Sequence, residues 1–394
     1  MIGISKLYCG AVEPSDVLRY NRKSGDLPSH LLQFSADKKP VVVWNMTRRC
    51  NLKCMHCYSA SADMEYPDEL TTDEGKTLID DLAAFGAPVI LFSGGEPLMR
   101  RDLLELAQYA ADKGMRAVIS TNGTLITKDI AAQLRKINLS YVGVSLDGLE
   151  KTHDRFRGAK GAFAKAMEGI RNCREAGIKV GIRFTVNKRN LADVPAMFDL
   201  LKQEKIERLC FYHLVYTGRG SKLRDEDLTH EETRALLDLI AARTKKMFEE
   251  GFAPEILTVD NHADGPYLYL KMKKENPARA KEVLELLEMN EGNSTGVGIG
   301  CVSWDGEVYP DQFWRNRPLG NVRQKPFSKI WTDEKNEFLM KLKNKKKHLR
   351  GRCAACAWLN VCGGNFRARA EAAGDVWGDD PACYLTDEEI ARKE

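Results

Sequence analysis

Three cysteines occur within eight residues near the start of the chain: Cys50, Cys54 and Cys57. The spacing Cys-x3-Cys-x2-Cys can hold three irons of a [4Fe–4S] cubane and leave the fourth iron open to bind a small molecule. A zinc site is the alternative. Structural zinc needs four closed ligands, commonly in Cys-x2-Cys pairs, and the fourth would have to be His56 or a distant group. The pattern therefore favours an iron–sulfur cluster.

A second group of cysteines lies near the C-terminus and comprises Cys353, Cys356, Cys362 and Cys383. Four thiolates can saturate a second cubane with no open iron, and a four-cysteine zinc site is the alternative. With 11 cysteines in the chain, a reducing compartment would direct them to metal binding or catalysis instead of disulfides. We expect a cytoplasmic protein.

The composition excludes several classes of partner. The 394 residues are 43% hydrophobic with a formal net charge of +4, which is typical of a globular protein and does not indicate a nucleic-acid partner. There is no run of 18 apolar residues and no secretory leader pattern, so we expect no membrane. The short basic cluster at residues 345–347 is interpreted as a solvated loop or helix end.

The elements that must position the first cysteines form a repeating pattern. Short apolar, β-branched runs alternate with segments of helical period between residues 40 and 215, which predicts βα units around a parallel sheet. We expect strands near 41–45, 89–92, 117–120, 141–146, 180–186 and 208–215, and helices near 103–112, 128–136, 163–176, 194–203 and 231–250. A further helix follows the first strand, with a capping box at Thr71 and Glu74 and a stop at Gly86.

This pattern predicts an α/β fold, a partial (β/α)6 barrel similar to a TIM barrel. Cys50 to Cys57 then lie in the loop after the first strand, at the edge where parallel sheets carry their chemistry. We expect an N-terminal segment (1–39) packing on the barrel and a core at 40–250. A linker or insert near the active site (251–299), with a helix over 277–289, and a small cysteine domain (300–394) complete the chain.

Glycines and polar residues end the predicted strands. Ser93-Gly94-Gly95-Glu96-Pro97 follows the second strand, Ser120-Thr121-Asn122-Gly123 the third and Ser145-Leu146-Asp147-Gly148 the fourth. Glycines admit close backbone approach, and Glu96 offers an anion for an ammonium group. Ordinary strand-to-helix turns are the alternative for the segments that follow the third and fourth strands.

Together with the cysteine triplet, these segments resemble the radical S-adenosylmethionine (SAM) enzymes. The resemblance implies that Cys50, Cys54 and Cys57 hold a catalytic [4Fe–4S] cluster at which SAM is cleaved to a 5′-deoxyadenosyl radical. It also implies that SAM contacts a set of residues at the strand ends: His56, Tyr58, Gly94, Gly95, Glu96, Asn122, Ser145, Asp147 and Arg183. For Arg183, a paired structural arginine is the alternative.

The C-terminal cysteines resemble the SPASM extension of these enzymes, which carries auxiliary iron–sulfur clusters. A full extension has seven cysteines for two clusters, but here Asp311 and Phe366 stand where two of them are usual. The resemblance therefore implies one auxiliary [4Fe–4S] cluster, held by Cys353, Cys356, Cys362 and Cys383. The remaining Cys301 is interpreted as a small buried apolar residue.

Segments 1–10, 41–50, 259–265 and 311–315 are similar to the tetrapyrrole-modifying branch of this family. That resemblance implies an enzyme of haem biosynthesis that removes two acetate side chains from 12,18-didecarboxysiroheme, giving iron-coproporphyrin III. It also implies a low-potential electron donor. The alternatives are the haem d1 relative that acts on propionate arms, a peptide-modifying SPASM enzyme and a zinc-stabilised binding scaffold.

An iron macrocycle with carboxylate arms needs cationic side chains for the arms and a histidine or tyrosine for the iron. The candidate substrate residues are His213, Arg219 and His262, which fall in loops at the predicted active face. Arg155 and Arg157 are further candidates for the carboxylates. For all three arginines, structural ion pairs are the default interpretation.

Overall fold

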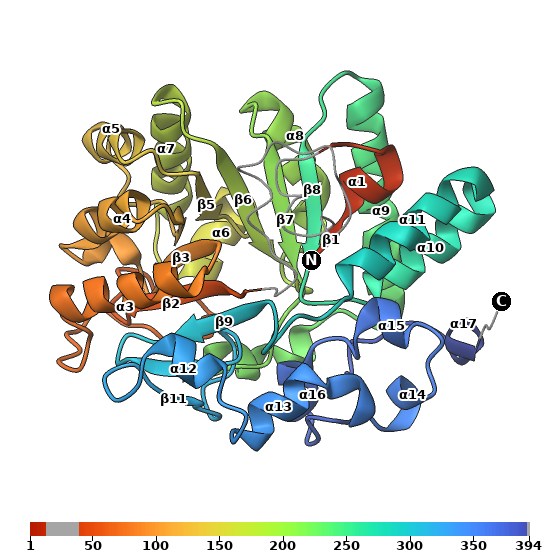
Figure 1. Cartoon of the computed structure of the whole chain (residues 1–394). Helices are drawn as coiled ribbons and strands as arrows, with labels where there is room; N and C mark the ends of the chain where they lie inside the picture. Colours follow the sequence, from red (N-terminus) through yellow and green to blue (C-terminus); the bar gives the residue numbers. More distant parts are fainter. Residues whose placement is uncertain (13–38, 392–394) are drawn as a thin grey trace.

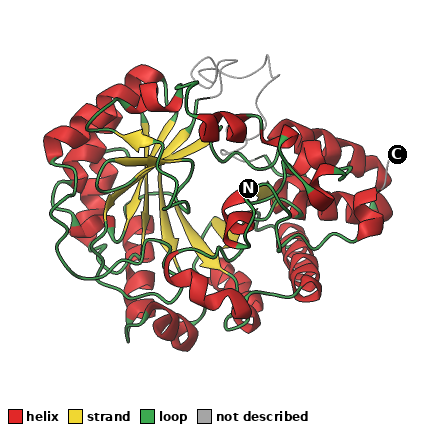
Figure 2. Ribbon diagram, turned by 90° about the horizontal axis from the view of Figure 1, so that it is seen from below, coloured by secondary structure: helices red, strands yellow, loops and turns green. Residues whose placement is uncertain are grey.

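A central sheet organises the chain in the computed structural model, which describes residues 1–12 and 39–391. The six predicted strands are confirmed, and each pairs in parallel with the next along the chain. They are β2 (Val41–Thr47), β3 (Val89–Gly94), β4 (Arg116–Thr121), β5 (Tyr141–Ser145), β6 (Val180–Thr185) and β7 (Arg208–Tyr212). The helices lie outside the curved sheet, as a partial barrel requires (Figure 1; Figure 2).

Further strands extend both edges of this sheet. β8 (Glu255–Val259) pairs in parallel with β7, and β9 (Ile299–Val302) pairs in parallel with β2. Antiparallel strands follow at the margins: β1 (Ile2–Gly3) beside β8, then β10 (Glu307–Tyr309) and β11 (Gly320–Asn321) beyond β9. Two edge strands that the sequence analysis did not predict thus join the parallel sheet.

The segment 251–299 is more regular than a linker. It contains β8, α10 (Asp264–Glu275), α11 (Pro277–Asn290) and the first residue of β9. α11 confirms the helix expected over 277–289. β8 is only five residues long and is buried throughout, so it lacks the alternation that marks a half-exposed strand.

The predicted helices of the barrel are confirmed within one residue at each end. They are α3 (Thr72–Phe85), α4 (Leu103–Asp112), α5 (Lys128–Lys136), α7 (Ala162–Glu175), α8 (Val194–Gln203) and α9 (His230–Glu249). Thr71 and Glu74 form the expected capping box, and Gly86 ends α3 with a left-handed φ of 81°. Gly75 within α3 faces the Trp44 ring, where an added Cβ would lie only 2.7 Å from the ring.

Shorter helices complete the described part of the chain. They are α1 (Ile4–Cys9), α6 (Glu150–Arg157), α12 (Phe327–Trp331), α13 (Glu337–Lys343), α14 (Gly351–Ala354), α15 (Leu359–Cys362), α16 (Arg367–Ala372) and α17 (Asp387–Ala391). Single 3-10 turns occur at Pro97–Met99, Leu191–Asp193 and Lys345–Lys347, and a longer 3-10 segment at Gly218–Glu226. Most of the N-terminal segment expected to pack on the barrel, residues 13–38, lies outside the described residues. No described helix has the length and apolarity that crossing a membrane demands.

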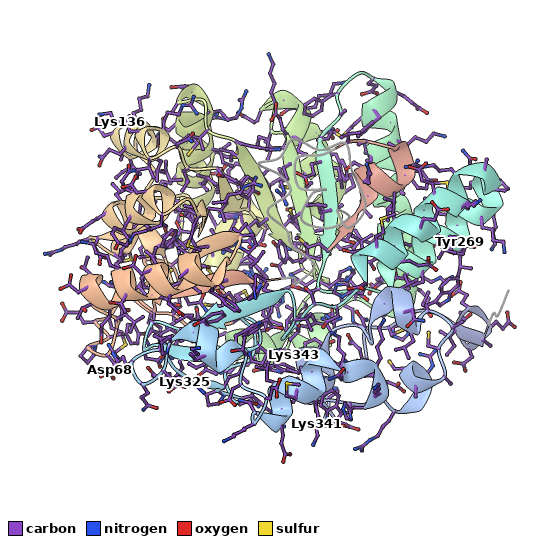
Figure 3. All side chains as sticks on the ribbon, in the orientation of Figure 1. Asp68, Lys136, Tyr269, Lys325, Lys341 and Lys343 are labelled. Carbon is purple, nitrogen blue, oxygen red and sulfur yellow. The ribbon has the colours of Figure 1, made fainter. Side chains whose placement is uncertain are left out.

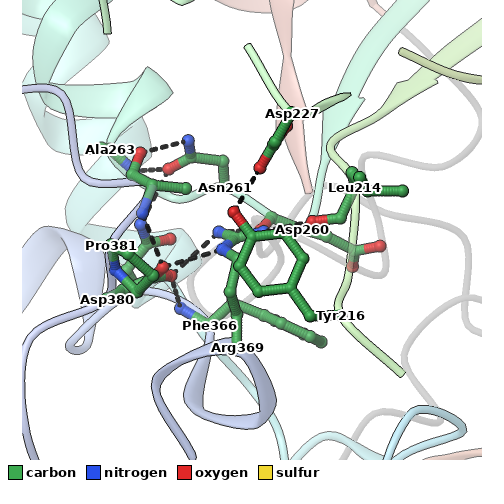
Figure 4. Close-up of polar contacts among 12 residues, drawn as sticks. Leu214, Tyr216, Asp227, Asp260, Asn261, Ala263, Phe366, Arg369, Asp380 and Pro381 are labelled. Atoms are coloured by element: carbon green, nitrogen blue, oxygen red, sulfur yellow. Dashed lines mark hydrogen bonds and ion pairs between the residues drawn. The ribbon is translucent and has the colours of Figure 1, made fainter. Parts of the chain in front are cut away.

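The C-terminal part packs against the barrel through hydrogen bonds from Arg369, which also forms a buried ion pair with Asp380. The Arg369 Nε lies 2.7 Å from Asp380 Oδ1, and both side chains are fully buried. The same guanidinium donates to the carbonyls of Leu214 and Asp260, which follow β7 and β8 (Figure 4). This pair therefore connects the cysteine-rich domain to the strand ends that carry the site.

Candidate active site

A cavity opens at the C-terminal ends of the parallel strands. Its lining combines the first cysteine loop, residues at the ends of β2 to β8, and two residues of the C-terminal domain. The lining includes Cys50, Cys54, His56, Cys57, Tyr58, Ser93, Gly94, Gly95, Asn122, Ser145, Arg157, Arg183, Tyr212, His213, Asp260, Gln312 and Phe313. Most of the predicted SAM-binding residues are thereby brought to one place.

Hydrogen-bond donors from the surrounding chain point at the three cysteine sulfurs of the first group. They are the Leu52 N–H to Cys50 Sγ, the Ser61 N–H to Cys57 Sγ and the Arg157 Nη1 to Cys54 Sγ, each at 3.4 Å. Burial raises the pKa of the Cys57 thiol, but hydrogen bonds from Ser59 and Ser61 outweigh this effect, so its pKa is lowered. Burial raises the pKa of Cys50 to about 12. Such donors stabilise sulfur ligands and tune the potential of a cluster.

The backbone of this loop is held by residues distant in sequence. Arg219 donates from Nε to the Cys54 carbonyl at 2.7 Å and from Nη1 to the Ser61 carbonyl at 2.8 Å. Gly94 and Gly95 pack directly beneath the start of the loop, where an added Cβ at Gly95 would lie 2.1 Å from the Arg49 carbonyl oxygen. The glycines are thus required by backbone packing.

The three thiols of the first group line one cavity together. Among the described residues, no three Cys, His, Asp or Glu side chains converge closely enough to hold one metal ion. Three thiolates on one loop are the protein ligands that a [4Fe–4S] cubane with one open iron requires.

The second cysteine group has the same character. Cys362 is buried, and burial together with the charges of Cys383, Cys353 and Cys356 raises its pKa well above the ordinary value. The Asn365 N–H donates to Cys362 Sγ at 3.2 Å. These four thiols fit an auxiliary cluster.

The positions that depart from a full SPASM pattern are filled by packing and hydrogen bonds. Asp311 is buried and accepts a hydrogen bond from Thr295 Oγ1 at 2.7 Å. Phe366 is buried and meets Phe313 edge-on at 5.4 Å. Cys301 is a fully buried free thiol, as expected.

Asp147 and Arg157 form a buried ion pair, and His56 lies beside it. The carboxylate of Asp147 pairs with Arg157, and His56 Nε2 lies 3.8 Å from Asp147 Oδ2. Burial lowers the pKa of His56 to about 4, so the ring is neutral at pH 7. It stacks on Phe156 at 4.6 Å. His56 lines the cavity and Asp147 does not, so a contact between Asp147 and SAM stays a prediction.

Glu96 lies beneath the cavity floor with its carboxylate engaged by the chain. Oε1 accepts from Thr121 Oγ1 at 2.7 Å and from the Leu98 N–H at 3.1 Å, and Oε2 accepts from the Asn122 N–H at 2.7 Å. These bonds tie the ends of β3 and β4 together. Oε2 keeps capacity for one more donor, so its contact with the SAM ammonium group also stays a prediction.

Arg183, Tyr58 and Asn122 line the cavity with defined partners. Arg183 donates from Nη2 to the Tyr212 hydroxyl at 2.7 Å and also contacts Ser120. Tyr58 donates to Asn45 Oδ1 at 2.8 Å. Asn122 Nδ2 donates to Asn51 Oδ1 at 2.8 Å, next to the cysteine loop. Arg183 is paired with neutral hydroxyls and keeps its charge available to an anion.

Only one of the three predicted substrate residues lines the cavity. His213 does, and its Nε2 lies 2.9 Å from Asp264 Oδ2. His262 instead directs Nε2 toward the Met1 amino group at 3.3 Å, and Arg219 braces the cysteine loop. Both therefore lie outside the cavity lining.

Asp260, Gln312 and Phe313 are lining residues that the sequence analysis missed. Asp260 follows β8 with a left-handed φ of 66°, and its Oδ2 is buried without a hydrogen-bond partner. Burial and the neighbouring Asp311 raise its pKa to about 7. Strained, unpartnered groups of this kind concentrate at functional sites. The one sequence signal for Asp260 as a site residue was its position directly after β8, and that strand was not predicted.

This fold and site define a radical SAM enzyme with a SPASM domain, and the chain belongs to that family. Residues 44–201 match the Radical SAM superfamily, and residues 298–357 match the SPASM iron–sulfur cluster-binding domain. A solved structure of Streptococcus suis SuiB bound to S-adenosylmethionine shares the fold, with a TM-score of 0.70 and 18% identity over 91% of this chain and 81% of that one.

Two curated relatives are similar over most of the chain. Fe-coproporphyrin III synthase of Methanosarcina barkeri is 68% identical over 99% of both chains. Pre-heme d1 synthase of Dinoroseobacter shibae is 44% identical over 88% of this chain and 87% of that protein. Both exceed the similarity expected from a shared fold alone.

The cluster assignment predicts the iron content. Protein reconstituted anaerobically should hold about eight irons, two cubanes. Replacing Cys50, Cys54 and Cys57 together with alanine should remove about four irons and abolish SAM cleavage, measured as 5′-deoxyadenosine formation. Cys301→Ala is the matched control and should keep all eight. Twelve irons, or zinc at the C-terminal cysteines, would contradict the assignment.

Glu96→Gln should weaken SAM binding by about 10- to 150-fold, because a charge-assisted hydrogen bond contributes roughly 1.5 to 3 kcal/mol. Binding is measured by calorimetry on reconstituted protein with an unchanged iron content. Thr121→Val is the control, since it removes a neutral donor to the same carboxylate and should reduce stability without a comparable loss of affinity. Equal affinities for Glu96→Gln and the wild type would show that Glu96 is only structural.

Asp260 predicts a pH-dependent stability. Its folded-state pKa of about 7 lies above the ordinary 3.8, so the free energy of unfolding should fall as pH rises from 4 to 7. Asp260→Asn should remove up to about 4 kcal/mol of this fall, measured by anaerobic urea unfolding. The exposed Asp68→Asn should leave the pH profile unchanged. A profile unaffected by Asp260→Asn would show that Asp260 is ionised throughout.

Proposed function

We propose that this protein removes the two acetate side chains of 12,18-didecarboxysiroheme and so produces iron-coproporphyrin III. The observation that carries the proposal is the 68% identity to Fe-coproporphyrin III synthase over 99% of both chains. The cavity supports the proposal, because three thiols that can hold a cluster line it together with Arg183 and His213. A cytoplasmic location without a nucleic-acid partner is part of the same proposal.

The cofactors of this family are SAM and iron–sulfur clusters, and SAM bound at the open iron supplies a radical that takes a hydrogen atom from the substrate. The chain must hold the reacting groups and exclude water. Leu214, Val215 and Phe313 form an apolar wall of the cavity. Arg183 offers a partly buried cation to the carboxylate of SAM, because its hydrogen-bond partners are uncharged. His213 is oriented by Asp264 and faces the substrate space.

The chemistry sets a requirement for electrons and protons. Each acetate leaves when the bond between its methylene carbon and the ring carbon breaks and one hydrogen atom has been removed from the macrocycle. The departing carboxymethyl group then takes up one electron and one proton to become acetate. One further electron is used to cleave SAM, so each acetate released consumes two electrons from an external donor.

The alternative reaction takes place at the propionate arms of the same macrocycle. The 44% identity to pre-heme d1 synthase keeps this second activity as the competing proposal. The greater identity to Fe-coproporphyrin III synthase over the whole length favours removal of acetate.

Turnover of didecarboxysiroheme tests the proposal directly. Anaerobic enzyme with SAM and a strong reductant should release two acetates per macrocycle and form 5′-deoxyadenosine. The expected product is iron-coproporphyrin III, identified by mass spectrometry. A product that keeps its acetates but has lost propionates would favour the competing activity, and absence of any tetrapyrrole binding would refute both.

His213 should affect binding more than His262. Titration of didecarboxysiroheme with the enzyme should shift its visible absorption, and His213→Ala should alter this shift because His213 lines the cavity. His262→Ala is the matched control, since this ring faces the Met1 amino group. An unchanged spectrum for His213→Ala, or a larger change for His262→Ala, would assign the contact to another residue.

A further inference from the structure

A concentrated basic surface lies next to the second cysteine group. Residues 341–347 contain five lysines and no acidic residue, and we call them the basic segment. They run from the end of α13 through a 3-10 turn at Lys345–Lys347. The chain as a whole carries only +4, so this charge is local. Figure 3 shows Lys341 toward the lower edge of the molecule and Lys136 at the upper left.

Two lysines of the basic segment, Lys346 and Lys347, are exposed and have no acidic partner among the described residues. Lys341 has an exposed acidic neighbour, Glu337, at 3.7 Å. Lys343 donates to the Trp331 carbonyl at 2.6 Å, and Lys346 donates to the neutral amide of Asn360 at 3.2 Å. Lys346 and Lys347 are exposed, and no described carboxylate lies within 4 Å of either. Lys346 and Lys347 therefore present their charge to a partner.

The basic segment lies across a cavity from a loop that contacts Cys362. Residues 343–347 form one wall of this cavity, and the other wall includes residues 290–294. Within that second wall, the Asn293 N–H donates to the Cys362 carbonyl at 3.0 Å. An added Cβ at Gly292 would lie 2.1 Å from the same carbonyl oxygen. One short backbone contact thus separates the lysine-lined cavity from the auxiliary cysteines.

The auxiliary cysteines also reach the surface. Cys353 and Cys356 are partly exposed, and the residues between and after them, Ala354, Ala355 and Ala357, are exposed. Small side chains at this edge let another protein approach the thiolates closely. By contrast, Cys50 and Cys54 of the first group are buried.

We propose that the basic segment and the exposed loop 353–357 form the docking surface for an acidic electron-carrier protein. The lysines of this surface supply the charge that recognises the carrier, and the partly exposed Cys353 and Cys356 bring the carrier close to the cluster for electron transfer. One electron leaves the reduced carrier, which is oxidised, and enters the cluster held by the second cysteine group, which is reduced; no bond breaks and no proton moves. The inference rests on the electron requirement of the proposed function.

Charge reversal tests the surface, with an acidic two-cluster ferredoxin as the probe. Lys346→Glu combined with Lys347→Glu should weaken ferredoxin binding about tenfold at low ionic strength and flatten its salt dependence, measured by calorimetry. Lys136→Glu combined with Lys165→Glu changes the net charge equally on exposed positions of the barrel helices. This control should bind ferredoxin nearly as well as the wild type.

Electron transfer gives a second readout. Stopped-flow oxidation of reduced ferredoxin by the Cys50→Ala/Cys54→Ala/Cys57→Ala protein reports on the auxiliary cluster alone, and the two lysine reversals should slow it. Wild-type protein with the same reversals should keep its turnover when a small chemical reductant replaces ferredoxin. This turnover measurement with the chemical reductant separates failure of docking from failure of the proposed function. Equal weakening by the control pair, or unchanged binding and transfer after reversal of Lys346 and Lys347, would overturn the proposal.

Discussion

The buried guanidinium of Arg369, which is paired with Asp380, connects the C-terminal domain to the barrel. Neither side chain is exposed, and the pair is satisfied on all sides, because the guanidinium binds carbonyls that follow β7 and β8 while the carboxylate accepts the Phe366 and Ala382 N–H groups. Breaking such a pair leaves an uncompensated buried charge, at a typical cost of about 3 to 5 kcal/mol. The position of the C-terminal domain on the barrel is therefore fixed by geometry as well as by apolar packing.

A similar logic governs the first cysteine loop. A loop that must present three sulfurs to a cluster has few hydrophobic contacts of its own. Arg219 donates hydrogen bonds to carbonyls of the loop, and Arg157 donates one to the second sulfur. The two glycines at the end of β3 let the loop backbone pack directly against the sheet. Gly94 and Gly95, which the family resemblance associates with SAM, thus also shape the loop.

The sequence predicted the barrel well because its signals are local. The capping box at Thr71 and Glu74, the glycine Gly86 and a one-sided apolar stripe located α3 at its observed ends. β8 was missed because a strand buried on both faces has no alternation of apolar and polar residues. Asp260 was missed with it, because this residue follows β8. Gln312 and Phe313 were missed because only the tertiary fold brings them across the cavity. For His262 and Arg219, loop position indicated the right face of the barrel but could not give the direction of each side chain.

Gln312 and Phe313 reach the cavity from the C-terminal domain, whereas the remaining walls come from the barrel and the strand that extends it. The reaction chamber is consequently a joint product of two modules that are recognised as separate families. A substitution at the cavity in either module alters the lining that both modules form together. Among relatives with the same barrel, a change of substrate could therefore arise in the appended domain, and the two modules would be inherited as one evolutionary unit.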